Sequence, residues 1–205
     1  MLVAKRYKKL KYYVSFPEGY EEGKTYPVLF YTHGVGGRGK RLSLIKGDEV
    51  YSLNPCRNDF IIVMPQCYSD TWFDIFEELI NFCKHVYESP FTDKSRFYAT
   101  GVSMGGYACY QLMMSVPEIF AAAIVCCGGG MYWNGARLKD IPIRAFHGAK
   151  DTVVYPEESR KMVASAGERA ELIIYENADH DCWTETYKNR ENYEWLLKNT
   201  KNPAV

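Results

Sequence analysis

The stretch that decides the fold is Arg96-Phe97-Tyr98-Ala99-Thr100 followed by Gly101-Val102-Ser103-Met104-Gly105-Gly106. The first five residues predict a strand, and residues 104–115 predict a helix. Glycines two residues on either side of Ser103 allow strand and helix to meet in a sharp turn where a Cβ would clash. In this context the pattern indicates that the Ser103 hydroxyl projects from the sheet edge at a helix N-terminus, which stabilises developing negative charge. The alternative is a glycine-rich turn whose serine has no role.

Outward from this turn, apolar runs alternate with segments of helical periodicity. Further strands are predicted at residues 12–16, 28–32, 60–64, 121–127, 143–146 and 172–175, and further helices at about 73–86, 157–166 and 184–197. This alternation predicts the α/β class, with a mostly parallel central sheet, right-handed crossovers and helices on both faces. Chemistry in such folds is built at the carboxyl ends of the strands. Only about 15 residues separate Cys127 from Ile143, too few for a folded cap domain, so we expect an open site.

Length and composition set the broad class. The 205 residues, 47% of them hydrophobic and 24% charged, predict one globular domain over residues 1–205 and exclude disorder as the main state. Lys+Arg 25 and Asp+Glu 25 cancel, so no global field favours nucleic acid or an anionic membrane. The longest apolar run, Ala121 to Cys127, is too short to span a bilayer, and no signal peptide follows Met1. We therefore expect a soluble, cytoplasmic protein.

Two local compositions admit more than one interpretation. Basic residues between Lys5 and Lys11 alternate with Tyr7 and Leu10, a pattern that favours a solvated edge strand over a phosphate-binding arm. The seven cysteines are odd in number and contain no Cys-x-x-Cys spacing, so no zinc site is expected. We interpret them as reduced thiols, several of them buried in apolar stretches.

A serine hydroxyl becomes a nucleophile only when a base takes its proton, and four histidines are available. His85 falls on a helix beside a lysine and is expected at the surface. His33 ends one strand and shapes a glycine-rich turn, and His147 ends another strand and is expected to be enclosed by the loop after it. His180 lies in the loop between the last strand and the last helix, where a base can reach Ser103. We predict His180 as the base, against a solvent-exposed loop histidine.

The imidazole needs a carboxylate that fixes its tautomer. Asp151 follows a predicted strand, and the chain order Ser103, Asp151, His180 is that of a Ser…Asp…His triad. The alternatives are Asp179, Glu157 and a structural role for Asp151.

An oxyanion needs aimed backbone N–H donors. Met104 supplies one by its place after the serine. The second is expected from the glycine-rich loop after the 28–32 strand, with Val35 as first choice and Gly36 as the alternative. The same loop lacks the Gly-Lys-Ser/Thr ending of a phosphate-binding loop.

The chain resembles the α/β-hydrolase superfamily along nearly its whole length. More narrowly, it is similar to small bacterial carboxylesterases, also described as predicted peptidases or phospholipases, and to feruloyl esterases and dienelactone-hydrolase-like proteins. The matching segments are Tyr26 to Leu29 with His33-Gly34, Met64 to Cys67 with Trp72, Gly101 to Tyr107, His147 to Asp151 with Val153-Val154, and His180 to Trp183. The resemblance implies an ester hydrolase without metal or organic cofactor.

The residues that line the substrate pocket are expected at the same edge of the sheet. Aromatic and amide side chains there suit an aromatic acyl group or a sugar ring, although each of them is as compatible with closing the core. The predicted substrate-binding residues are Gln66, Trp72, Trp133 and Trp183, with Tyr68 and Met104 as further wall residues. Cys67 and Cys182 are expected to be inert neighbours. The basic stretch Arg38 to Arg41 either favours an acidic or sugar-linked substrate or is simply solvated.

The sequence thus predicts a serine carboxylic-ester hydrolase that forms a covalent acyl-enzyme. Its substrates would be short-acyl, feruloyl or acetyl-sugar esters, either small or linked to carbohydrate, and neither nucleic acid nor membrane would be a partner. A serine peptidase of the same fold is the first alternative. A binding module without catalysis and an acyltransferase are the others.

Overall fold

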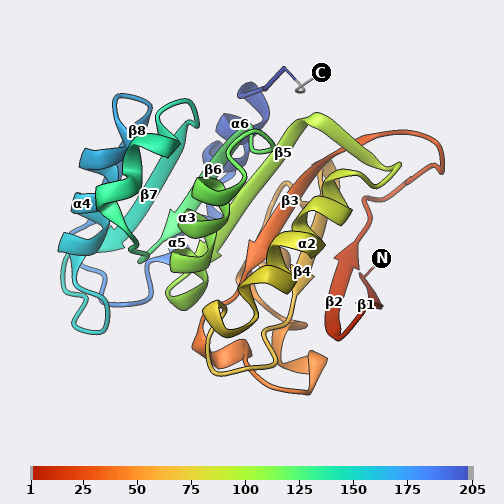
Figure 1. The fold of residues 1–205 in the computed structure, drawn as a ribbon, viewed down its shortest axis with the longest axis horizontal. Helices are drawn as coiled ribbons and strands as arrows, with labels where there is room; N and C mark the ends of the chain where they lie inside the picture. The colour runs from red at the N-terminus through yellow and green to blue at the C-terminus, as the bar shows by residue number, and fades with distance from the viewer. Residues whose placement is uncertain (1, 203–205) are drawn as a thin grey trace.

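A computed structural model describes residues 2–202 and shows an eight-stranded sheet with helices on both sides (Figure 1). The strand order is β1-β2-β4-β3-β5-β6-β7-β8, and the six strands from β4 to β8 in that order are parallel. The strands are β1 Leu2–Tyr7, β2 Leu10–Ser15, β3 Tyr26–Thr32, β4 Ile61–Pro65, β5 Thr92–Val102, β6 Ala122–Cys126, β7 Ile143–Gly148 and β8 Ala170–Tyr175. The predicted α/β architecture with a mostly parallel sheet is confirmed.

The basic N-terminal segment forms a hairpin. β1 is the edge strand, pairs antiparallel with β2, and β2 pairs antiparallel with β4. Lys8 turns the chain between them with a φ of 51°. The expected edge strand is therefore present, and the strand predicted at residues 12–16 lies one position inside the edge.

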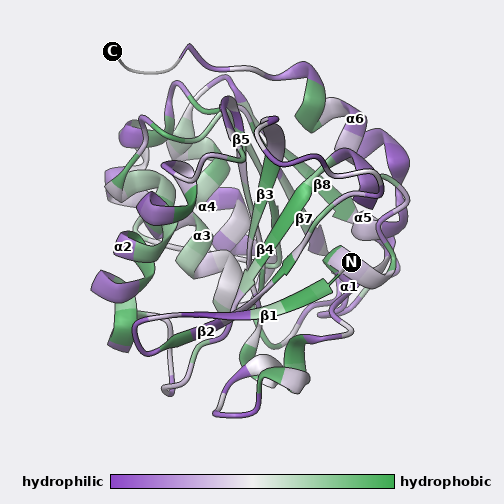
Figure 2. Ribbon diagram, turned by 90° about the vertical axis from the view of Figure 1, so that its right-hand side faces the viewer, coloured by the Kyte–Doolittle hydropathy of each residue, from purple (hydrophilic) through white to green (hydrophobic). Residues whose placement is uncertain are grey.

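Helices cover both faces because successive residues of the central strands point to opposite sides, and both sides are apolar. Phe30 belongs to the buried cluster on one face that also contains residues of α2 (Phe76–Tyr87), α3 (Met104–Ser115) and α4 (Pro156–Ala166). Tyr31 belongs to the cluster on the other face, which also contains residues of α1 (Glu49–Ser52), α5 (Trp183–Lys188) and α6 (Arg190–Lys198). Figure 2 shows the apolar strands enclosed between the two helical layers. Within residues 2–202, no helix combines the length and the apolar character that crossing a membrane requires.

Two helical predictions are corrected. The single helix expected over residues 184–197 is two helices, because Asn189 takes an extended conformation (φ −81°, ψ 113°) and its side chain accepts a hydrogen bond from the Glu191 amide. Asparagine is a favoured N-cap residue, which explains the break. The helix expected from residue 73 begins as α2 at Phe76, after a short 3-10 turn over residues 73–75.

Candidate active site

Ser103 sits at the turn between β5 and α3 with a φ of 53° and a ψ of −121°, in the left-handed half of conformational space that side chains other than glycine rarely adopt. The neighbouring glycines make the turn feasible. A Cβ on Gly105 would lie 1.9 Å from the Thr32 carbonyl oxygen, and one on Gly101 would lie 2.4 Å from the Gly105 carbonyl oxygen. The turn therefore requires glycine at both positions, as the sequence predicts, and it directs Ser103 away from the sheet.

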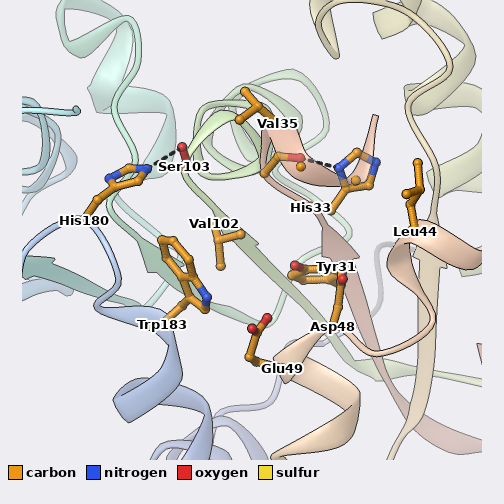
Figure 3. A pocket seen from close by; sticks show the side chains of 13 residues that line it. Tyr31, His33, Val35, Leu44, Asp48, Glu49, Val102, Ser103, His180 and Trp183 are labelled. Carbon is orange, nitrogen blue, oxygen red and sulfur yellow. Dashed lines mark hydrogen bonds between the residues drawn. The ribbon is translucent and has the colours of Figure 1, made fainter. Parts of the chain in front are cut away.

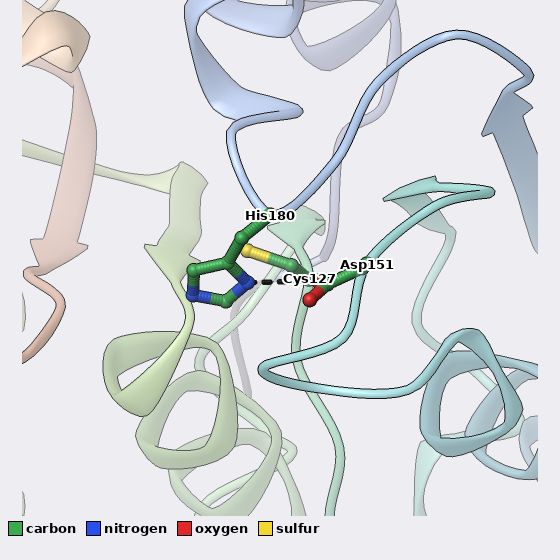
Figure 4. Close-up of side chains that lie close together, drawn as sticks. All are labelled: Cys127, Asp151 and His180. Atoms are coloured by element: carbon green, nitrogen blue, oxygen red, sulfur yellow. Dashed lines mark hydrogen bonds and ion pairs between the residues drawn. The ribbon is translucent and has the colours of Figure 1, made fainter.

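Loops from two further strands bring a histidine and a carboxylate to this serine. His180, between β8 and α5, places Nε2 2.9 Å from Ser103 Oγ (Figure 3). Its Nδ1 lies 2.7 Å from Oδ2 of Asp151, which follows β7 (Figure 4). The three residues that sequence order singled out thus form one continuous hydrogen-bonded chain. Asp179 instead accepts a hydrogen bond from the Asp181 amide with its side chain.

Asp151 is held as an ionised carboxylate. Burial raises its pKa, but hydrogen bonds from His180 and from the amides of Val154 and Val153 outweigh burial and bring the pKa below its ordinary value. The two amides donate to Oδ1 over 2.9 and 2.8 Å, which leaves Oδ2 for the imidazole. An ionised partner at Nδ1 keeps the proton there, so Nε2 is free to accept the Ser103 proton.

A buried histidine supports the same carboxylate from behind. Nε2 of His147 lies 3.1 Å from Asp151 Oδ2 and 2.8 Å from the Val154 carbonyl oxygen. Its Nδ1 lies 2.7 Å from Oγ of Ser159, on α4. The expected enclosure of His147 is confirmed, since the side chain is fully buried. The role of Ser159 was missed by sequence reasoning, because only the folded structure brings α4 against the end of β7.

Cys127 is the third potential metal-ligating side chain near this pair. Its Sγ and the ligand atoms of Asp151 and His180 lie within 4.8 Å of one another, the one such group found among residues 2–202 (Figure 4). The imidazole nitrogen that faces Asp151 is used in their hydrogen bond. Burial, the largest effect, raises the pKa of the Cys127 thiol and favours its neutral form. The arrangement therefore fits a triad better than a metal site.

The loop over residues 34–37 borders the serine on the other side. The amides of Gly37 and Arg38 donate to the carbonyl oxygens of Gly34 and Val35 within the loop. They are thus engaged, which leaves Val35 and Gly36 as the candidate donors toward a substrate oxygen. Val35 is 53% exposed and lines the cleft beside Ser103.

His33 fixes that loop from below. It is buried, its Nδ1–H donates to the Gly34 carbonyl oxygen over 2.6 Å, and its Nε2 accepts from the Cys67 amide over 2.9 Å. Burial lowers its pKa to about 4, so the ring is neutral near pH 7. The predicted turn-shaping role of His33 is confirmed by these contacts. His85 is exposed on α2, also as expected.

Three of the predicted wall residues are not where sequence reasoning put them. Trp72 is fully buried and donates from Nε1 to the His33 carbonyl oxygen over 3.0 Å. Gln66 is also buried and donates to the carbonyl oxygens of Gly37 and Arg41. Both side chains brace the loop from its far side, so neither lines the cleft beside Ser103, contrary to the prediction. Trp133 is 73% exposed and does not line the cleft at Ser103.

The remaining expected neighbours divide between the cleft and its surroundings. Trp183 does line the cleft, with its ring centroid 5.4 Å from that of His180. Tyr68 instead donates from its hydroxyl to Glu78 over 2.7 Å, and Met104 packs against the core. The thiols of Cys67 and Cys182 are buried and donate to backbone carbonyl oxygens.

The cleft itself has a volume of about 350 Å³ and opens between the Ser103 turn and the long β3–β4 connection. Tyr31, Leu44, Val102 and Trp183 supply its apolar surface. Asp48 and Glu49 also line it, at the start of α1 (Figure 3). Sequence reasoning missed this segment because residues 42–52 show no clear periodicity. Arg38 is not part of the lining: it donates to the Val35 and Asp70 carbonyl oxygens.

The chain is similar to known proteins in sequence. The profile of the Prolyl oligopeptidase family matches residues 66–134, which include the Ser103 turn. The curated relative "Probable feruloyl esterase C" of Aspergillus terreus (strain NIH 2624 / FGSC A1156) is 26% identical over 152 residues. That match covers 70% of this chain and 56% of the relative.

Solved structures agree on the fold. A thermostable esterase matches with a TM-score of 0.87 and 30% identity, over 98% of this chain and 63% of that one. Est1E from Butyrivibrio proteoclasticus matches with a TM-score of 0.73 and 15% identity, over 97% of this chain and 99% of that one. The chain thus spans just over half of the feruloyl esterase relative and less than two thirds of the thermostable esterase. Its fold is the α/β-hydrolase fold, as predicted.

Proposed function

We propose that this chain, a member of the α/β-hydrolase superfamily, is a serine hydrolase of carboxylic esters. The observation that carries the proposal is the hydrogen-bonded chain from Ser103 through His180 to Asp151, which ends in a cleft wide enough for a small acyl or alcohol group. The esterase names of the relatives support the same reaction class.

The geometry supports a two-step mechanism. Ser103 Oγ attacks the ester carbonyl while His180 Nε2 takes its proton, and ionised Asp151 stabilises the resulting imidazolium. The amides of Met104 and Val35 stabilise the negative charge on the carbonyl oxygen. His180 then returns the proton to the departing alcohol, which leaves an acyl group on Ser103. A water molecule repeats the sequence and releases the acid and free Ser103.

The substrates we propose are short-acyl or aromatic esters, including feruloyl and acetylated-sugar esters, small or attached to a carbohydrate. Trp183 is the aromatic side chain that supports this range, because it lines the cleft next to His180. Nucleic acid and membrane are not part of the proposal. We also infer a cytoplasmic location, because all seven cysteines are free and buried.

A serine peptidase is the second candidate, favoured by the match to the Prolyl oligopeptidase family over residues 66–134. Amide cleavage uses the same triad but must protonate a poorer leaving group.

A panel of matched esters and amides distinguishes the esterase from the peptidase. It contains para-nitrophenyl acetate, butyrate and octanoate, methyl ferulate, an acetylated sugar, and the amide counterpart of each acyl group. We expect kcat/KM on the esters to exceed that on the matched amides by at least about 100-fold. A preference for amides would establish the peptidase instead, and no turnover of either series would contradict both.

A further inference from the structure

The cleft beside Ser103 is lined by negatively charged side chains. Apart from the histidines, its charged lining side chains are Asp48 and Glu49, and no lysine or arginine of residues 2–202 lines it. The two carboxylates are neighbours at the start of α1, both half-buried. In Figure 3 they lie on the wall that carries Tyr31, and Trp183 lies between Glu49 and His180.

The negative charge of this wall is not neutralised inside the protein. No ion pair joins Asp48 or Glu49 to a lysine, arginine or histidine in the part of the chain that the structure describes. The Tyr31 hydroxyl forms a hydrogen bond with Asp48, but it is neutral and cannot balance a charge. Half-buried carboxylates without a counter-ion are costly, and a cation bound between them relieves that cost.

The site is more than an acidic cluster, because an independent feature calls for a ligand there. The cleft that the carboxylates line also holds the Ser103 hydroxyl, hydrogen-bonded to His180 over 2.9 Å. A substrate that places its carbonyl at Ser103 must put either its acyl or its alcohol group against this wall. Trp183 offers an aromatic face beside the carboxylates, a surface that also favours cations.

We propose that the group bound in this cleft carries a positive charge, so that the enzyme selects esters bearing an ammonium group over neutral or anionic ones. The inference rests on the proposed esterase function and narrows its substrate class. Asp48 and Glu49 are specificity residues that contact the ammonium group, and they take no part in the chemistry at Ser103. Anionic esters are disfavoured by the same charges.

The expected selectivity depends on pH in a defined direction. Burial and the neighbouring Glu49 raise the pKa of Asp48, against the lowering effect of the Tyr31 hydrogen bond, to about 7. The groups facing this wall are Tyr31 from β3, Glu49 from α1, and His33 and His180 across the cleft. Asp48 is neutral below its pKa and charged above it, so selectivity for the cation should grow from about pH 6 to about pH 8.

Two pairs of isosteric esters measure the selectivity. In each pair a quaternary ammonium nitrogen is replaced by a quaternary carbon, in the alcohol group of one pair (choline butyrate and its carbon counterpart) and in the acyl group of the other. The readout is the ratio of kcat/KM for the cationic over the neutral ester. Any effect of pH that acts equally on both members of a pair cancels from the ratio.

In the wild type we expect a ratio of at least about tenfold in one of the two pairs, increasing with pH. Glu49→Gln and Asp48→Asn should each reduce the ratio several-fold, and thermal unfolding midpoints close to that of the wild type show that the variants are folded. In Asp48→Asn the pH dependence of the ratio should disappear. Glu118→Gln, an exposed change outside the cleft, is the matched control and should leave the ratio unchanged.

Ratios at or below one in both pairs, or ratios that neither variant reduces, would overturn the inference while ester turnover still supports the proposed function. Turnover of no ester would instead count against the proposed function. Titration calorimetry with phenyltrimethylammonium on Ser103→Ala then tests the cation site without catalysis. We expect binding that weakens at least about tenfold when Glu49→Gln is added. Absence of binding, or binding that Glu49→Gln leaves unchanged, would overturn the inference.

Discussion

Replacing Ser103 with alanine should lower kcat on para-nitrophenyl butyrate by about 10⁶-fold, the loss seen when the nucleophile of a serine triad is removed. The substitution removes only the hydroxyl that lies 2.9 Å from His180 Nε2. The unusual backbone conformation of the turn is as accessible to alanine as to serine, and a Cβ is already accommodated there. The loss should therefore appear in turnover and not in the thermal unfolding midpoint.

Rates are measured for wild type and variant from parallel preparations. Ser115→Ala is the matched control, since it removes a serine hydroxyl at the far end of the same helix α3. It should keep activity within about twofold. Activity of Ser103→Ala within tenfold of wild type would show that another group is the nucleophile.

Replacing Asp151 with asparagine should lower kcat by about 10⁴-fold. The new side chain can still accept the hydrogen bonds from Val153 and Val154 through its oxygen. Its NH₂ group then faces His180 Nδ1, where the carboxylate accepts a hydrogen bond from the Nδ1–H group in the wild type over 2.7 Å. The imidazole is driven to carry its proton on Nε2, which can no longer take the proton of Ser103.

The matched control for this change is Asp179→Asn, which alters the carboxylate next to His180 in the same loop. Asp179 makes its own contact with the Asp181 amide, and the control should stay within about threefold of wild type. A larger loss in Asp179→Asn than in Asp151→Asn would reverse the assignment of the carboxylate. Equal unfolding midpoints of the two variants would show that the difference lies in the chemistry.

The parts of the site that could be predicted from the sequence are those that short segments and strand order determine. The Ser103 turn needs glycine at two positions whose Cβ atoms would meet backbone oxygens, so its shape can be predicted from a short segment. His180 and Asp151 follow strands, and parallel strands bring their carboxyl ends to one edge of the sheet. These residues could be assigned to the carboxyl edge of the sheet without knowing where their side chains point.

The parts that failed depend on how loops fold back. Trp72 and Gln66 follow β4 at the expected edge, but their side chains turn under the loop over residues 33–37 and hydrogen-bond to its carbonyl groups. Whether a loop side chain faces a cleft or the core behind it is set by tertiary contacts, which composition does not encode. Asp48 and Glu49 were missed for the related reason that they lie in a long connection whose sequence shows no clear periodicity, and only the folded structure places them beside Tyr31 in the cleft.

Acylation of Ser103 is best tested by covalent trapping of its hydroxyl. The protein is treated with a fluorophosphonate, and the adduct is counted by intact-mass analysis and located by peptide mapping. We expect one adduct per chain on Ser103, none on Ser103→Ala, and much slower labelling of Asp151→Asn, because the nucleophile is activated through His180. Failure of Ser103 to label, or an adduct on another residue that persists in Ser103→Ala, would show that Ser103 is not the nucleophile.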